Sequence, residues 1–175
     1  MDDDFDITKL TKGKKPKRVN SKNKGHSFER KIATLFNNKF QTKEFGRSPG
    51  SGAFATTHNI PDHLKIHGDL ITPKDFKFCI ECKKGYNKEN IYSLLNKRSY
   101  LWKFIDQCEK DSKACSKEPL VIFQQDRQKI LAIVRCNIFN IDIKKVDINR
   151  KSNKEYNNYS MYLLEDLLLY DDIWV

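Results

Sequence analysis

Two acidic residues and a lysine stand within hydrophobic stretches of this chain, where a charged side chain is unfavourable without a partner. In the segment HGDLITPKDFKFCIECKK, Asp69 precedes one apolar run, and Glu81 and Lys83 lie within the next. If residues 76–83 form a strand, period-two alternation puts Glu81 and Lys83 on the same face. With Asp69 on a neighbouring strand, the carboxylates would form a divalent-cation site beside a lysine, which suits phosphodiester hydrolysis.

A helix that precedes these residues could bring a third carboxylate to the site. Apolar residues recur at helical spacing from Ser27 onward, and Ser27 is placed to cap the first turn. The apolar positions are Phe28, Ile32, Leu35, Phe36 and Phe40. Glu29 falls in the predicted first turn, where the helix dipole favours a carboxylate and the side chain can reach whatever the helix packs on. A solvated glutamate is the alternative interpretation of Glu29.

A glycine-rich loop, GRSPGSGAF at residues 46–54, follows the predicted helix. Its glycines at positions 50 and 52 let a backbone approach a phosphate closely, and Arg47, Ser48 and Ser51 could add hydrogen-bond donors. A short glycine loop alone is a weak signal. The segment therefore gains meaning only together with the acidic residues.

The remaining elements follow from periodicity and turn residues. Strands are expected near 66–71 and 76–83, with a turn at TPKD between them. Residues 90–115 have a helical pattern, interrupted near 97–99, and the segments PLVIFQQ and KILAIVR predict a strand hairpin. The helical stripe, interpreted as core, comprises Ile91, Leu94, Leu95, Leu101, Trp102, Ile105 and Cys108. After residue 135, the segment YSMYLLEDLLLY predicts a strand followed by a short helix.

Length and charge limit the organisation of the chain. Its 175 residues, 38% of them hydrophobic, are enough for one domain with a modest core. We expect a flexible basic arm at 1–24, a core at 25–135 and a C-terminal segment, 136–175, that packs on this core. The net charge is +10, and residues 25–154 alone hold 25 basic and 14 acidic groups. Such an excess indicates a polyanionic partner, most often nucleic acid, although a lysine-rich solvated surface is the alternative.

Five cysteines without regular spacing favour free thiols in a reducing compartment over disulfides. Cys79 and Cys82 form a C-x-x-C pair, but residues three apart on a strand face opposite ways, so buried thiols are preferred over a zinc site. No apolar stretch is long enough to span a membrane, and the N-terminus lacks the order of a signal peptide. We therefore expect a protein of the cytoplasm, with no membrane partner.

The order of these elements resembles the PD-(D/E)XK nuclease superfamily. Within it, the run GHSFERKIATLF, FGRSPGSGAF, GDLI and FKFCIECKK is similar to the archaeal-type Holliday junction resolvases and their phage-encoded relatives. The resemblance covers residues 25–135, with Trp102 and Gln107 where phage relatives tend to carry an aromatic residue and a glutamine. It implies an α/β restriction-endonuclease-like fold, in which helices flank a central mixed β-sheet.

The resemblance also implies roles for individual residues. Asp69 and Glu81 would bind Mg²⁺, or Mn²⁺ in its place, helped by the backbone carbonyl of Cys82, and Glu29 would act directly or through a water. Lys83 would orient or activate the attacking water, and the products would carry 5′-phosphates. No other small-molecule cofactor is implied. The residues expected at the DNA are Arg30, Arg47, Ser48, Ser51, Gly52, Lys84 and Gln107.

The choice between acidic residues depends on their spacing. The literal Pro-Asp pair ends at Asp62, which lies nineteen residues before Glu81, whereas Asp69 lies twelve before it, as two adjacent strands would require. We therefore choose Asp69 and interpret Asp62 as a polar loop residue near the DNA path. His58, His63 and His67 invite a metal-site or HNH-nuclease interpretation, but no second ligand pair flanks them, and loop or DNA-facing histidines are preferred.

The substrate expected from the resemblance is branched DNA, a four-way junction that a homodimer would cut at two symmetric sites. A nuclease of the same superfamily acting on ordinary duplexes or flaps, and a non-catalytic DNA-binding module, remain as alternatives. Candidate dimer contacts are apolar or aromatic positions that the monomer core does not require, although these could equally close the monomer. They are Tyr100, Leu101, Phe104, Tyr159, Tyr162 and Tyr170.

Overall fold

The computed structural model describes residues 21–49, 67–95, 98–152 and 155–175. Its helices are α1 (Ser21–Phe40), α3 (Ile91–Leu95), α4 (Tyr100–Ala114) and α5 (Leu164–Leu167). Its strands are β1 (Gly46–Arg47), β2 (Leu70–Ile71), β3 (Phe78–Lys84), β4 (Glu118–Gln124), β5 (Leu131–Arg135), β6 (Val146–Ser152) and β7 (Glu155–Leu163). None of the helices in these ranges is long and apolar enough to cross a membrane.

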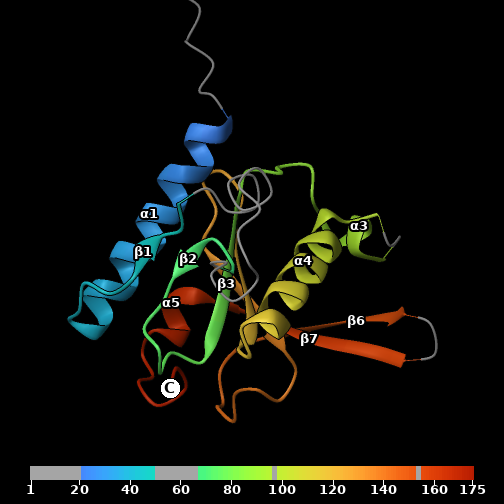
Figure 1. Ribbon diagram of the computed structural model, residues 1–175. Coiled ribbons are helices and arrows are strands. Elements are labelled where there is room, and N and C mark those ends of the chain that lie inside the picture. The colour runs from blue at the N-terminus through green and yellow to red at the C-terminus, as the bar shows by residue number, and fades with distance from the viewer. Residues whose placement is uncertain (1–20, 50–66, 96–97, 153–154) are drawn as a thin grey trace, which may run out of the picture.

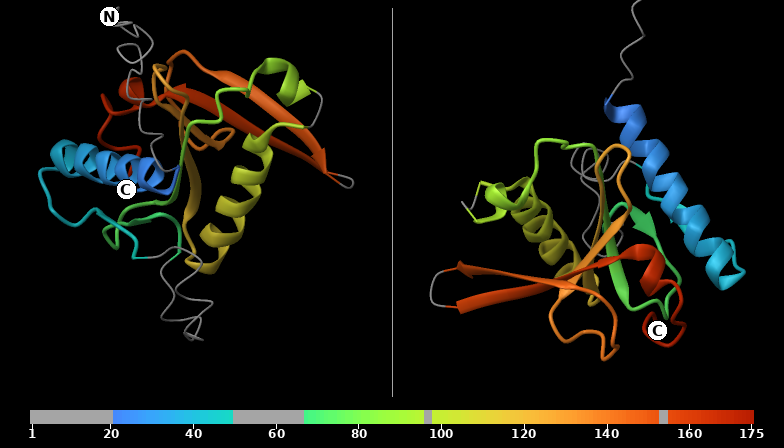
Figure 2. Two further views of the ribbon diagram at one scale, coloured as in Figure 1. Left: turned by 90° about the horizontal axis from the view of Figure 1, so that it is seen from above. Right: turned by 180° about the vertical axis from the view of Figure 1, so that it is seen from behind.

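A five-stranded sheet in the order β3-β4-β5-β7-β6 carries the fold. β3 pairs with β4 in parallel, as the crossover through α4 requires, and the other neighbours are antiparallel. Figures 1 and 2 show α1 and α4 on either side of β3, while the β6–β7 hairpin extends away from α1 on the side of α3 and α4. The predicted α/β fold, a mixed sheet flanked by helices, is confirmed.

Alternation along β3 decides what each face of the sheet contacts. Phe78, Ile80 and Cys82 join the core beneath α1, which includes Phe28 and Phe36. On the other face, α4 packs on the apolar side chains of β4 and β5. The strand is buried on both sides because it lies between the two helices, and this explains its nearly continuous apolar sequence.

The first helix begins earlier than its sequence pattern indicates. It starts at Ser21, so the predicted cap at Ser27 is wrong and the end of the expected arm, residues 21–24, is helical; residues 1–20 lie outside the described residues. Glu29 is consequently in the interior of the helix, not in its first turn. The helix-dipole argument for this carboxylate therefore does not apply.

The second helical region divides where the sequence predicts an interruption. Ser99 caps α4, accepting a hydrogen bond from the backbone nitrogen of Leu101 at 3.0 Å. The core stripe is confirmed on α4, but on α3 it is wrong for Ile91 and Leu95, which are 65% and 74% exposed, whereas Leu94 is partly buried against the α4 cluster. A five-residue helix has too few turns to bury a stripe by itself, and α3 has no buried residue.

The C-terminal segment is part of the sheet. The predicted strand and short helix are confirmed as β7 and α5, and β7 lies between β5 and β6. Most of the candidate dimer contacts are unavailable because the monomer buries them: Leu101, Phe104, Tyr159 and Tyr162 are all at most 6% exposed. Tyr100 remains 48% exposed.

Candidate active site

The backbone of Gly68 and Asp69 lies unusually close to β3. The Asp69 backbone nitrogen donates to the Ile80 carbonyl at 2.8 Å, and a Cβ on Gly68 would lie only 2.7 Å from the same oxygen. Gly68 also has φ +76°, a conformation that favours glycine. The Asp69 carboxylate then accepts a 2.8 Å hydrogen bond from the Cys82 backbone nitrogen. A glycine thus allows the close approach that positions this carboxylate.

The short strand that directly follows Asp69 does not pair as expected. β2 pairs with β1 in a separate two-stranded ribbon, not with β3 as a hairpin partner. The backbone nitrogen of Ser48 donates to the Asp69 carbonyl at 2.9 Å, so this ribbon fixes Asp69 from its other side. Ser48 is buried, and its hydroxyl has no hydrogen-bond partner among the described residues. This placement favours a positioning role for Ser48 over the expected DNA contact.

Glu81 and Lys83 lie on one face of β3, as strand alternation predicts. Lys83 Nζ forms an ion pair with Glu81 and lies 3.8 Å from Asp69 Oδ2, so the ammonium bridges the two carboxylates. It also lies 5.6 Å from the centre of the Phe104 ring on α4. Burial lowers the pKa of Lys83, but Glu81 and Asp69 outweigh this effect and leave it raised. Lys83 is therefore a fixed positive charge at neutral pH.

The Glu81 carboxylate is short of partners. The residue is 1% exposed, and neither of its oxygens accepts a well-formed hydrogen bond within the described part of the chain. Burial, followed by the negative charge of Asp69, raises the pKa of Glu81 to about 8 despite the ion pair with Lys83. The single ammonium of Lys83 faces both Glu81 and Asp69, so the two carboxylates together still carry more negative charge than their partner neutralises.

A divalent cation fits this deficiency. Mg²⁺ takes oxygen ligands and is commonly held by one or two carboxylates, with waters or substrate oxygens completing its shell. Glu81 and Asp69 are such a pair. The described residues contain no group of three or more His, Cys, Asp or Glu side chains at ligand spacing. A metal ion here would therefore rely on these two carboxylates together with backbone, water or substrate oxygens.

Glu29 approaches the same region from α1. It is largely buried, and its Oε2 accepts a 2.7 Å hydrogen bond from Arg47 Nε on β1. Arg47 is placed by its register opposite Leu70 of β2, which directly follows Asp69. The ribbon thus orients both Asp69 and the cationic partner of Glu29.

A cavity of about 610 Å³ lies between the start of α1 and the end of β3. It brings together Glu29, Asp69, Cys82, Lys83 and Lys84. The lining also includes residues that sequence reasoning missed, because their proximity depends on the early start of α1 and the turn after β3. These are Ser21, Lys22, Lys24, Gly25, His26, Gly85, Tyr86 and Asn87.

Of the other residues expected at the DNA, two lie away from the cavity and one lies at its edge. Arg30 and Gln107 are exposed and do not line the cavity. Lys84 Nζ lies 5.5 Å from the centre of the Phe28 ring, which holds its stem along α1. The residues expected in or near the glycine loop that lie outside the described residues are Ser51, Gly52, His58, Asp62 and His63.

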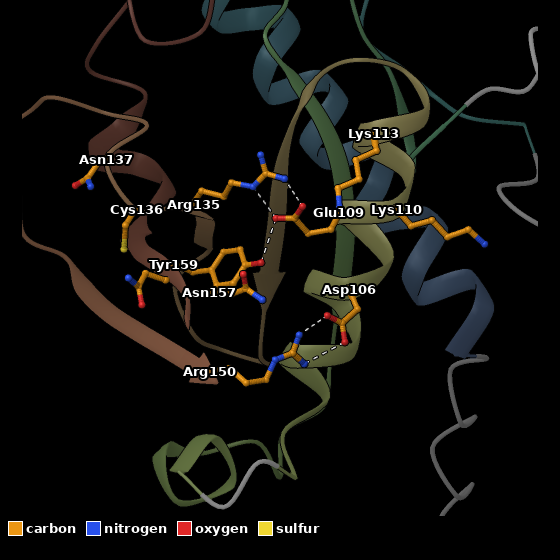
Figure 3. Close-up of a pocket in the computed structure, with 11 residues that line it drawn as sticks. Asp106, Glu109, Lys110, Lys113, Arg135, Cys136, Asn137, Arg150, Asn157 and Tyr159 are labelled. Atoms are coloured by element: carbon orange, nitrogen blue, oxygen red, sulfur yellow. Dashed lines mark hydrogen bonds and ion pairs between the residues drawn. The ribbon is translucent and has the colours of Figure 1, made fainter. Parts of the chain in front are cut away.

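A second cavity of about 700 Å³ lies where α4 meets β5, β6 and β7 (Figure 3). Both of its acids are held in ion pairs: Arg135 pairs with Glu109, which also accepts from the Tyr159 hydroxyl, and Arg150 pairs with Asp106. Lys110 and Lys113 leave the lining with a net positive charge. None of the predicted catalytic residues lines it. The cavity next to β3 is therefore the better candidate for chemistry.

Comparison with known proteins decides the family. The family described as "Phage putative PDDEXK endonuclease" matches residues 20–172, most of the chain. This chain belongs to that family. The predicted PD-(D/E)XK superfamily and its phage relatives are confirmed, and membership supports a nuclease. Protein D14 of Escherichia phage T5 is 31% identical over 115 residues, which cover 62% of this chain and 67% of that protein. No solved structure matches the chain.

Proposed function

We propose that this phage PD-(D/E)XK endonuclease is a metal-dependent endodeoxyribonuclease that resolves four-way DNA junctions. The observation that carries the proposal is the pair of buried carboxylates, Glu81 and Asp69, which share the single ammonium of Lys83. The basic charge of the chain supports a nucleic-acid substrate. Its place of action would be the host-cell cytoplasm.

Asp69 and Glu81 would hold Mg²⁺, or Mn²⁺, together with the Cys82 carbonyl. The bound ion would draw charge from the phosphate and make a bound water a stronger acid. Asp69 has one oxygen engaged by the Cys82 backbone nitrogen, which fixes the direction of its carboxylate. The hydrogen bond ties the carboxylate of Asp69 to β3, the strand that supplies the second carboxylate, Glu81.

Lys83 would act as a donor and positive charge, since its raised pKa keeps it protonated. It would orient the attacking water and stabilise charge on the phosphate without removing a proton. Glu29 would accept a hydrogen bond from a water at the site. Its pairing with Arg47 limits repulsion between this third carboxylate and the phosphate.

Junction resolution would require a homodimer, because two symmetric strands must be cut and a two-fold axis presents two identical sites. The exposed apolar side chains of α3, Ile91, Tyr92 and Leu95, provide a contact surface that the monomer leaves open. Sedimentation of the wild-type chain at micromolar concentration, with and without junction DNA, tests this. A strict monomer in both states would leave a simpler nuclease of duplexes or flaps.

The substrate is tested by cleavage of a labelled synthetic four-way junction in Mg²⁺, beside its linear arms and a flap of the same sequence. We expect paired cuts in the junction, products with 5′-phosphates, and little cutting of the arms. Equal cutting of all substrates would favour the duplex or flap nuclease. Binding to the junction without cleavage in Mg²⁺ or Mn²⁺ would favour the DNA-binding module.

A further inference from the structure

Three chain segments meet at the rim of the cavity beside β3. The Asp126 carboxylate, in the turn after β4, accepts hydrogen bonds from Lys24 Nζ on α1 at 2.5 Å and from Asn87 Nδ2 at 2.8 Å. The Asp126 backbone nitrogen donates in return to Asn87 Oδ1 at 2.9 Å. One anionic group is thus held by an ammonium and an amide that come from two separate elements.

The two donors belong to the cavity, whereas the acceptor does not. Lys24 and Asn87 line the cavity together with Asp69 and Lys83, but Asp126 is absent from its lining. Lys24 Nζ lies 3.9 Å from the position that a Cβ on Gly85 would take, which places the ammonium next to the end of β3. The donors can therefore serve an anion that enters the cavity.

The bond to Asp126 is of a kind that exchanges readily. The Lys24 and Asp126 side chains are 33% and 37% exposed, and ion pairs at such exposure are weak and screened by salt. Hydrogen bonds from Asn87 and then Lys24 lower the pKa of Asp126, which keeps the carboxylate ionised. A phosphodiester offers the same charge and more acceptor oxygens, and DNA releases a counterion for each phosphate that a lysine neutralises.

We propose that Lys24 and Asn87 form a subsite for a DNA backbone phosphate at the rim of the active-site cavity, and that Asp126 occupies this subsite in the DNA-free protein. The inference rests on the proposed function, because it takes DNA as the ligand. Beyond that function, it identifies Asp126 as a residue that competes with the DNA phosphate for Lys24 and Asn87. The carboxylate of Asp126 leaves the two donors as DNA enters, and a backbone phosphate takes its place.

The test measures DNA binding by the full chain in EDTA, with linear duplex and four-way junction probes, between about 50 and 200 mM salt. Lys24→Gln should reduce the slope of log K against log salt by about 0.9 and weaken binding about eightfold at 0.1 M salt, as loss of one phosphate contact requires. Asp126→Asn should tighten binding about 1.5- to 5-fold, the factor for release of a surface ion pair. In Lys24→Gln/Asp126→Asn the tightening should disappear.

Matched controls come from an exposed ion pair elsewhere, Lys129 with Glu165. Lys129→Gln and Glu165→Gln make the same charge changes and should alter binding less than the changes at the rim. Asn87→Ala should weaken binding without changing the salt slope, since it removes a neutral donor. Circular dichroism would check that each variant is folded.

Several results would overturn the subsite. One is an unchanged salt slope in Lys24→Gln that is folded, and another is an effect of the control pair as large as that of the rim residues. A third is weaker DNA binding by Asp126→Asn, which would show that Asp126 only anchors α1. A wild-type chain that binds both probes but cuts no junction would contradict the proposed function and leave the phosphate subsite in place. Conversely, junction cleavage with an unchanged Lys24→Gln slope would remove only the subsite, and failure to bind either probe would overturn both proposals.

Discussion

Replacement of Glu81 by glutamine should make the metal-free protein more stable near pH 8. The pKa of Glu81 is raised from an ordinary 4.5 to about 8, so between these values the folded chain binds more protons than the unfolded chain. Stability then falls as the pH rises from about 4.5 to about 8. Glu81→Gln removes the group that titrates and with it this part of the pH dependence.

The magnitude follows from the size of the shift. At about 1.4 kcal/mol per pH unit, a rise from 4.5 to about 8 has an upper limit of about 5 kcal/mol. The value of about 8 already includes the opposing effect of the Lys83 ion pair, so the loss of that pair is not subtracted again. We expect a stabilisation of a few kcal/mol, below about 5 kcal/mol, at pH 8 and little difference at pH 5.

Urea unfolding of both proteins at pH 5 and pH 8, first in EDTA and then in Mg²⁺ or Mn²⁺, measures this directly. At a metal concentration about 100 times Kd, the wild-type chain should gain about 2.7 kcal/mol at pH 8, and the variant should gain much less. The two proteins differ only at residue 81, so the contributions of all other groups cancel in the comparison. The reasoning is refuted if wild-type stability in EDTA does not fall between pH 5 and pH 8, or if the metal stabilises both proteins equally.

Two further predictions concern the support of the site and the N-terminal segment. Gly68→Ala should destabilise the fold by at least about 1–2 kcal/mol and reduce cleavage, because a Cβ would meet the Ile80 carbonyl and φ is +76°. Thermal unfolding checks this beside the control Gly46→Ala, whose Cβ would meet nothing within 4 Å; equal losses of stability in the two variants would contradict it. Removal of residues 1–20, which carry six basic groups, should flatten the salt dependence of DNA binding and leave the unfolding transition unchanged. An unchanged slope would mean that the segment makes no phosphate contact.

Local patterns predicted the elements whose residues alternate regularly. Period-two alternation gave β3 with Glu81 and Lys83 on one face, and the turn between two apolar runs gave the β4–β5 hairpin. The chain spacing of Asp69 and Glu81 indicated that the two acids lie near each other, and the structure brings Asp69 against β3. These features depend on neighbouring residues, which a single sequence contains.

Features that depend on distant contacts were not predictable in the same way. The early start of α1 is hidden by its polar sequence SKNKGH, and the exposure of Leu95 is hidden by an apolar stripe that continues into α4. The pairing of β1 with β2, and of Lys24 with Asp126, joins segments far apart in the chain. No local periodicity records such contacts, because they are fixed only when the sheet has assembled.

The central claim, metal-dependent hydrolysis at Asp69 and Glu81, is tested most directly by cleavage of a labelled four-way junction by wild-type, Asp69→Asn and Asp62→Asn proteins, with Mg²⁺ and with EDTA. Asp62 is the matched control, an acid rejected on its spacing from Glu81. We expect the wild-type and Asp62→Asn proteins to cut only with Mg²⁺, and Asp69→Asn to be slower by orders of magnitude while it still binds the junction. Full activity of Asp69→Asn together with an inactive Asp62→Asn, or undiminished cleavage in EDTA, would contradict the assignment.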